Sequence, residues 1–198
     1  MTRDVMYTPV QRIPLPSLPD KGLILDIGGG GEGIVSRIWR QRVCAVDIRM
    51  NKIREAHIYP VRNTNWFLSD GASLCFESRA FGAVTQWFSL AYMRTWEKKR
   101  EVIREAYRTL STDGVLSILA AKIGGQYEKY ILRVRFELPD GTISETGYGL
   151  MGEQTQSPEE AEEVLRDVGF SVNHSEGGEY WFRIDAVKGN EPQSFPKA

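Results

Sequence analysis

The sequence predicts an α/β protein whose central sheet is seven-stranded and mostly parallel, with helices on both faces, an antiparallel C-terminal strand and an inserted β-hairpin. Three observations support this fold class. Short apolar segments alternate with helical segments, as they do in βαβ units. The apolar segment 23–27 runs into a glycine-rich loop, and acidic residues end three of the expected strands. Because parallel strands end at one edge of a sheet, these acids should meet there.

The glycine-rich loop 28–33 holds five glycines in six positions. Glycine adopts positive φ angles without a steric penalty and lets a ligand approach the main chain. The following segment, 34–39, is expected to form a helix whose first N–H groups point back at the loop. A strand, a glycine loop and a helix in this order are typical of a nucleotide-type cofactor site. A tight turn needed only for packing is the alternative interpretation.

Two cofactor classes compete for this loop, since its glycines also match the G-x-G-x-x-G spacing of dinucleotide folds. The next strand, 43–47, ends in Asp47, nineteen residues after Gly28, where a carboxylate can accept hydrogen bonds from ribose hydroxyls. NAD and S-adenosylmethionine both carry that ribose. Asp26 helps to separate them, because a carboxylate there would repel a pyrophosphate but attract the α-ammonium of a methionyl group or a water that holds it. The sequence therefore favours S-adenosylmethionine.

The segments that follow the glycine loop come in an order that is more informative than any one motif. Residues 65–70 are expected to form a third strand that ends in Asp70, and residues 81–93 a fourth strand with the loop after it. Residues 102–116 are expected to contain a helix, a tight turn and a fifth strand. In this order, from about residue 20 to 122, the chain resembles the class I S-adenosylmethionine-dependent methyltransferases, which have a Rossmann-like fold. It departs from them at Glu32, where the family's third glycine most often falls.

The resemblance implies methyl transfer from S-adenosylmethionine, with Asp70 accepting a hydrogen bond from the adenine amino group. It assigns cofactor binding to Asp26, Gly28, Gly29, Gly30, Asp47, Ile48, Asp70, Gly71, Ala72, Trp87 and Ser89. A sulfonium already activates its methyl group, so the enzyme needs to align the acceptor and exclude water. No metal is expected. If a proton must leave the acceptor, Tyr92 and Tyr148 are the candidate catalytic residues. Core packing is an equally good interpretation of Trp87.

The acceptor is expected to be a small molecule. The loop after the fourth strand lacks the Asn/Asp-Pro-Pro-Tyr/Phe signature by which methyltransferases of DNA, glutamine and adenine amino groups resemble one another, and it lacks the Pro-Cys of the cytosine C5 enzymes. Two other function classes stay open. One is an NAD(P)-dependent reductase. The other is a non-catalytic domain that binds S-adenosylmethionine or S-adenosylhomocysteine as a sensor or an assembly partner.

The domain is expected to span residues 21–188, after an irregular, proline-containing arm at 1–20. Residues 130–148 alternate between apolar and charged side chains around Pro139-Asp140-Gly141, which predicts an inserted hairpin with one apolar face. This hairpin is expected to act as a lid over the cleft or as a homodimer contact. Ser157-Pro158 should open a helix, followed by an antiparallel strand pair at 170–174 and 180–187. The polar tail 189–198 is expected to be disordered.

The length, net charge and cysteine content of the chain limit the kinds of partner and the cellular location that are expected. A chain of 198 residues fits one domain, and its net charge of −1 gives no global field that would attract nucleic acid or an anionic membrane. The basic run 98–100 is interpreted as a solvated helix face. Two cysteines fit neither a disulfide framework nor a metal site. No apolar run approaches the ~20 residues of a membrane span, and no signal peptide is recognisable, so a cytoplasmic location is expected.

Overall fold

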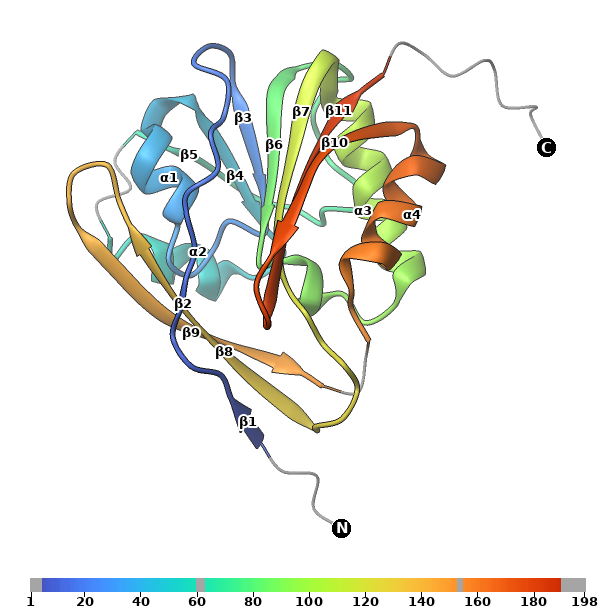
Figure 1. Ribbon diagram of the computed structural model, residues 1–198. Helices are drawn as coiled ribbons and strands as arrows, with labels where there is room; N and C mark the ends of the chain where they lie inside the picture. The colour runs from blue at the N-terminus through green and yellow to red at the C-terminus, as the bar shows by residue number, and fades with distance from the viewer. Residues whose placement is uncertain (1–4, 60–62, 153–154, 190–198) are drawn as a thin grey trace.

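The computed structural model describes residues 5–59, 63–152 and 155–189. Its centre is a seven-stranded sheet in the order β10-β11-β7-β6-β3-β4-β5 (Figure 1). These strands span Ile24–Ile27 (β3), Val43–Asp47 (β4), Asn65–Leu68 (β5), Phe81–Trp87 (β6), Leu110–Ala121 (β7), Phe170–Gly177 (β10) and Trp181–Lys188 (β11). Strands β3 to β7 are parallel, whereas β11 is antiparallel to β7 and to β10. The predicted seven-stranded, mostly parallel sheet is confirmed.

Strand order reverses beside β3, because β4 and β5 follow on one side of it and β6 and β7 on the other. In open α/β sheets such a switch point leaves a crevice beyond the carboxyl ends of the strands. The tight turn expected within residues 102–116 lies inside β7. The pairing of β7 with β6 changes register between Leu110 and Val115, and Asp113 has a φ of 59°, so the backbone bends there within the strand.

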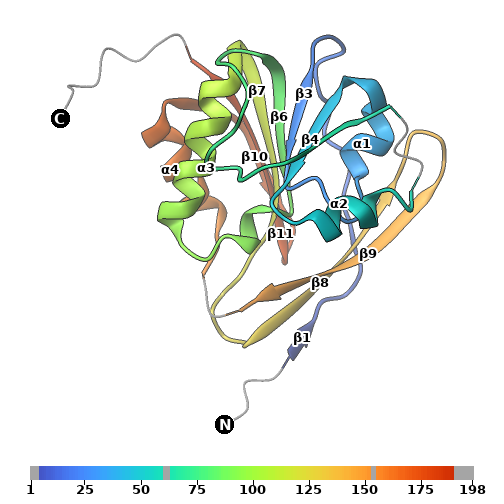
Figure 2. The same cartoon turned by 180° about the vertical axis from the view of Figure 1, so that it is seen from behind.

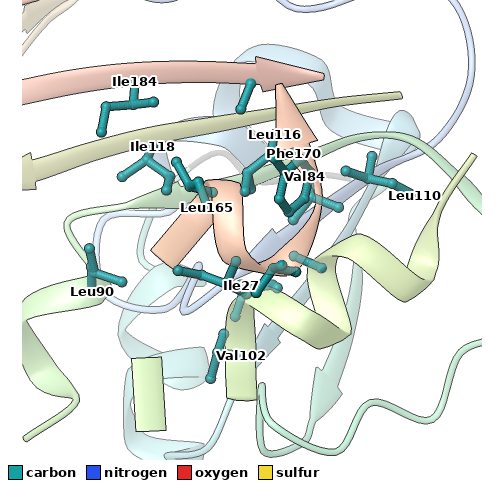
Figure 3. Packing of buried hydrophobic residues seen from close by; sticks show 14 of the residues in the cluster. Ile27, Val84, Leu90, Val102, Leu110, Leu116, Ile118, Leu165, Phe170 and Ile184 are labelled. Atoms are coloured by element: carbon teal, nitrogen blue, oxygen red, sulfur yellow. The ribbon is translucent and has the colours of Figure 1, made fainter. Parts of the chain in front are cut away.

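One face of the sheet is covered by two long helices, α3 (Trp96–Thr109) and α4 (Pro158–Val168). Their apolar side chains interdigitate with those of the strands, as Val102 and Leu165 do around Ile27 and Val84 (Figure 3). Helix α4 begins with the expected cap: Ser157 and Glu160 exchange side-chain hydrogen bonds with each other's backbone N–H groups. The two shorter helices are α1 (Ile34–Trp39) and α2 (Met50–Ala56).

The basic run on α3 is not wholly solvated. Lys99 is 2 % exposed, and its ammonium donates to Gln156 Oε1 at 2.8 Å and lies over the ring of Trp96. Burial lowers the pKa of Lys99 from 10.5 to about 8. The prediction failed here because helical periodicity placed Lys99 beside its charged neighbours, whereas the segment before α4 covers it.

The other face of the sheet is covered by α1 and by the hairpin of β8 (Lys129–Glu137) and β9 (Ile143–Met151), which lie together opposite α3 and α4 in both views (Figures 1 and 2). Alternate residues of β8, including Leu132, Val134 and Phe136, are buried in one cluster with Leu119 and Trp181 of the central sheet. The apolar face of the hairpin is thus covered by the chain itself. A homodimer through the hairpin stays a prediction, and burial of this face does not require it.

The N-terminal arm is less irregular than expected. Its residues form two short strands, β1 (Val5–Tyr7) and β2 (Gln11–Arg12), that pair in parallel with β8 on the edge that β9 leaves open. Between them, the Thr8 hydroxyl accepts a hydrogen bond from the Arg133 backbone N–H at 3.0 Å. An open strand edge presents unpaired backbone groups, which the arm satisfies. The tail from residue 190 lies outside the described residues. No described helix is long and apolar enough to cross a membrane.

Candidate functional site

A cavity of about 570 Å³ lies at the carboxyl ends of β3, β4 and β6, beyond the switch point of the sheet. All the residues predicted to bind a cofactor line it except Ala72. Tyr92 and Tyr148 line it as well. Ala72 instead donates its backbone N–H to Asp70 Oδ1 at 2.9 Å in the turn after β5. The structure thus brings the predicted residues together, while their roles in binding stay predictions.

The glycine loop is pressed against its neighbours at two positions. Gly28 has a φ of +77°, and a Cβ there would lie 2.3 Å from the Cβ of Ser89. A Cβ on Gly30 would lie 2.5 Å from Asp47 Oδ2. Only glycine fits at such separations, so the loop main chain forms the floor of the cavity with no side chain above it.

Asp47 connects this loop to the start of α2. Its carboxylate is buried and accepts hydrogen bonds from the N–H groups of Gly30 at 3.2 Å and Arg49 at 2.9 Å, one on each oxygen. A carboxylate has about four acceptor positions, so each oxygen keeps one for a ligand. Asp47 therefore helps to hold the loop and can also accept hydrogen bonds from a diol.

Asp26 is a buried acid in the cavity wall whose pKa is strongly raised. It is 3 % exposed, and its Oδ1 accepts a hydrogen bond from the Thr85 hydroxyl at 2.7 Å. Burial raises its pKa from 3.8 to about 7, and the nearby charge of Asp47 adds to the shift. A positive charge placed beside Asp26 would favour its ionised form.

Asp70 lies nearer to solvent, with 40 % of its side chain exposed. The hydrogen bond from the Ala72 N–H is the main reason why its pKa is lowered, and the Lys98 ammonium, 3.3 Å from Oδ2, contributes further. Asp70 is therefore a permanently ionised acceptor at the rim of the cavity. Lys98 lines the cavity too, which the sequence reasoning missed.

The back wall is aromatic and comes from two sheets. Phe88, directly after β6, has a φ of 60°, and its ring stacks on Tyr148 of β9 with centroids 4.5 Å apart. Trp87 stacks on Phe136 of β8 at 6.4 Å. A phenylalanine with positive φ is uncommon, and such strain persists only where the surroundings hold it. Trp87 is thus both core and cavity wall.

Glu32 connects the glycine loop to the hairpin by a hydrogen bond. Its Oε2 accepts a hydrogen bond from the Ser144 hydroxyl of β9 at 2.7 Å, and Ser144 Oγ in turn accepts one from Arg37 Nη1 at 3.0 Å. The departure from the family pattern at Glu32 therefore has a structural counterpart in the inserted hairpin. Phe136, Thr146 and Gly147 of the hairpin also line the cavity. Alternation along β8 indicated the inward face of Phe136, but nothing in the sequence indicated the contact between Glu32 and Ser144.

Tyr92 and Tyr148 both line the cavity, and their predicted catalytic role stays a prediction. Burial is the main reason why the pKa of each phenol is raised, and Glu32 raises that of Tyr148 further. Both phenols stay protonated near neutral pH, so they can donate or accept hydrogen bonds but are poor bases. The Arg49 guanidinium lies 5.3 Å from the centre of the Tyr92 ring and holds it beside the end of β4.

Comparisons with known proteins agree with this geometry. Residues 25–118 match a family described as a methyltransferase domain. A structure of an S-adenosylmethionine-dependent methyltransferase from Methanosarcina mazei is similar at a TM-score of 0.65 and 19 % identity, over 88 % of this chain and 95 % of that chain. One from Aquifex aeolicus is similar at a TM-score of 0.64 and 18 % identity, over 87 % and 85 % of the two chains.

A third similar structure is a glycopeptide N-methyltransferase complexed with S-adenosyl-L-homocysteine, at a TM-score of 0.59 and 16 % identity, over 86 % of this chain and 84 % of that chain. A search of curated protein sequences gave no match. At these identities the solved structures show the fold alone, whereas the domain match covers β3 to most of β7 with the glycine loop and the three strand-end acids. Residues 25–118 are thus similar to a methyltransferase domain, and the fold is that of the solved S-adenosylmethionine-dependent methyltransferases.

Proposed function

We propose that this protein binds S-adenosylmethionine in the cavity and transfers its methyl group to a small-molecule acceptor. The observation that carries the proposal is the convergence of Asp26, Asp47 and the glycine loop on one 570 Å³ cavity. A cavity of this size suits a small ligand. The match of residues 25–118 to a methyltransferase domain supports the reaction type. The acceptor is inferred from the absence of the nucleic-acid and protein signatures in the loop after β6.

The residues present fit the cofactor. Gly28 and Gly30 form a cradle that lines the cavity and carries no side chain, so a ligand can contact the main chain there. Asp47 keeps acceptor capacity for two ribose hydroxyls. The Ser89 hydroxyl is buried beside the cradle and has no hydrogen-bond partner among the described residues. A buried hydroxyl without a partner is costly, and a bound methionyl group would supply one.

When bound, S-adenosylmethionine supplies a methyl group that its sulfonium already activates. The chain's own residues then have three tasks. Asp26 and Asp47 hold the cofactor ends, the aromatic wall of Phe88 and Tyr148 excludes water, and the two tyrosine hydroxyls orient the acceptor by hydrogen bonds. Such alignment of reacting groups is a large source of rate enhancement in itself.

Two alternatives are less well supported. A dinucleotide reductase would place a pyrophosphate against a loop flanked by the carboxylates of Asp26 and Asp47, which disfavours an anion there. A non-catalytic sensor would use the same cofactor residues but would need no second ligand in the cavity. We also propose a cytoplasmic location, which is supported by two free cysteines, Cys44 and Cys75.

The proposal is tested by methyl transfer. Compounds that raise the melting temperature of the protein saturated with S-adenosylhomocysteine are collected by a metabolite screen, and each is then incubated with S-adenosylmethionine labelled in its methyl group. We expect label to appear in at least one of these compounds. If S-adenosylmethionine binds but no compound shifts the melting temperature or gains label, the sensor alternative replaces the enzyme.

Asp47→Ala is expected to weaken binding of S-adenosylhomocysteine by at least about tenfold, because hydrogen bonds to a charged acceptor contribute roughly 1.5–3 kcal/mol each. Calorimetric titration of folded protein measures the dissociation constant. Glu163→Ala, which removes an exposed carboxylate from α4, is the matched control and should leave the constant unchanged. If the constant changes less than twofold for Asp47→Ala, Asp47 does not bind the cofactor and serves only to accept the backbone hydrogen bonds of Gly30 and Arg49.

Cofactor binding is expected to strengthen as pH rises towards 7 and to level off above it. Below pH 7 the carboxyl of Asp26 is mostly protonated in the free protein. A cationic methionyl group favours the ionised form, so binding releases this proton and affinity gains up to about tenfold per pH unit below 7. The dissociation constant of S-adenosylhomocysteine is measured from pH 5.5 to 8 for the wild type and for Asp26→Asn, in which Asn can still accept from Thr85. Equal pH profiles for the two proteins would remove Asp26 from the site.

A further inference from the structure

The charges around the cavity are unevenly paired. On the side of α2 and α3, three of the lining cations have an acidic partner within the chain: Arg49 faces Asp47, Lys52 faces Glu55 and Lys98 faces Asp70. These pairs largely neutralise that side of the cavity. The exposed Arg94 lies on the loop that leads into α3.

The side formed by the glycine loop and the hairpin carries negative charge instead. Asp26 and Glu32 both line it, and neither forms an ion pair within the described residues. Asp26 lies directly beneath the glycine loop, since its Oδ2 is 2.3 Å from the position of a Cβ on Gly29. Under the proposed function, the carboxylate of Asp26 therefore interacts with the cofactor. The carboxylate of Glu32 stays available for another ligand, because Glu32 lies on the hairpin side of the loop.

One carboxylate oxygen of Glu32 remains available. Oε2 accepts the hydrogen bond from Ser144, whereas Oε1 accepts none from the described residues. The Arg37 guanidinium donates to Ser144 Oγ, and no hydrogen bond joins it to Glu32 among the described residues. Burial is the main reason why the pKa of the Tyr148 phenol is raised, and the carboxylate of Glu32 adds to the shift. Glu32 thus brings a carboxylate oxygen to the hairpin side of the cavity.

Aromatic faces surround the same space. Tyr148 and Phe88 stack on each other and line the same cavity as Glu32, and Trp87 and Phe136 continue the wall. An anion next to aromatic faces suits an organic ammonium group, since a cation is attracted both to a carboxylate and to the π-face of a ring. The apolar wall suits a ring-sized hydrocarbon body attached to the amine.

We propose that the acceptor is an amine with an apolar, ring-sized body, bound through Glu32 Oε1 and the aromatic wall. This inference rests on the proposed function. The bound ammonium gives up one proton to water, and the neutral nitrogen then forms the new C–N bond while the C–S bond breaks and its electron pair stays on sulfur. The product ammonium loses its second proton to water. Glu32 is a binding and specificity residue in this scheme.

Three probes of similar shape test the charge preference: 2-phenylethylamine, 2-phenylethanol and 3-phenylpropionate. Each is titrated calorimetrically into the protein saturated with S-adenosylhomocysteine. We expect the amine to bind at least about tenfold more tightly than the alcohol, and the carboxylate to bind most weakly, because the added contact is a hydrogen bond between two charged groups. Equal affinities, a preference for the carboxylate or no binding of any probe would overturn the inference.

Two variants separate charge from shape. Glu32→Gln keeps an acceptor for Ser144 but removes the charge, and it should abolish the preference for the amine over the alcohol. Ser144→Ala loosens the contact with the hairpin but keeps the charge, so the preference should persist. If both variants lose it equally, the hairpin position and not the charge decides selectivity. The two proposals can fail separately. If S-adenosylhomocysteine itself does not bind, the proposed function is overturned. If it binds but the probes show the wrong preference, only the inference about the amine is overturned.

Discussion

Replacing Gly30 by valine is expected to abolish cofactor binding, with a loss of affinity above about 100-fold. A Cβ at this position would lie 2.5 Å from Asp47 Oδ2 and 2.7 Å from Lys52 Cβ, so the Asp47 carboxylate must move away. Both hydrogen bonds to the ribose would be lost, at roughly 1.5–3 kcal/mol each, which converts to a factor of about 100 or more. The branched side chain would also block approach to the main chain.

The measurement is a calorimetric titration with S-adenosylhomocysteine, with circular dichroism to establish that the variant is folded. Gly149→Val on β9 is the matched control, because a Cβ there makes only ordinary contact, 3.7 Å from Ile131 Cδ1. It should bind normally. A folded Gly30→Val protein with unaltered affinity would place the cofactor elsewhere.

Leu132→Ala is expected to lower the free energy of unfolding by about 2–5 kcal/mol, the range for truncating a buried leucine. Leu132 is 1 % exposed and lies in the cluster between the hairpin and the central sheet. The hairpin therefore acts as a layer of the core. Replacing residues 130–148 by a flexible linker should consequently destabilise the whole domain and impair cofactor binding, instead of sparing it as a detachable lid would.

Chemical denaturation measures both the Leu132→Ala effect and that of Glu137→Ala, an exposed position on the same strand that serves as the control. The control should change stability by less than about 0.5 kcal/mol. A Leu132→Ala protein as stable as the control would mean that the hairpin is separable from the core.

The sequence predicted the parts of this fold that local patterns encode. The glycine loop, the strands ending in Asp47 and near Asp70, and the capped helix at Pro158 all follow from spacing and residue type. The edge of the sheet where the acids meet follows from the βαβ order, since parallel strands share their carboxyl ends. These features lie within short windows of sequence, where periodicity and turn chemistry are informative.

Other features depend on contacts between distant segments and had no local signal. Ser144 and Glu32 are 112 residues apart, and Thr8 bonds to a residue 125 positions away. Alternation along β8 showed that one face needed a partner but not which surface would cover it. The prediction that Lys99 is solvent-exposed was wrong for the same reason, because the segment before α4 buries it and its own helix does not. Ala72 does not line the cavity but donates its N–H to Asp70, a contact between close neighbours that its place after a strand did not specify.

The central claim is that the cavity beyond β3, β4 and β6 is a site for S-adenosylmethionine, and a calorimetric titration of the intact chain with S-adenosylmethionine, S-adenosylhomocysteine and NADH tests it most directly. We predict that the first two ligands bind once per chain at micromolar or lower dissociation constants, because the ribose acceptor Asp47 and the glycine cradle suit both. We predict no binding of NADH. Saturable NADH binding without any response to the two sulfur ligands would contradict the account.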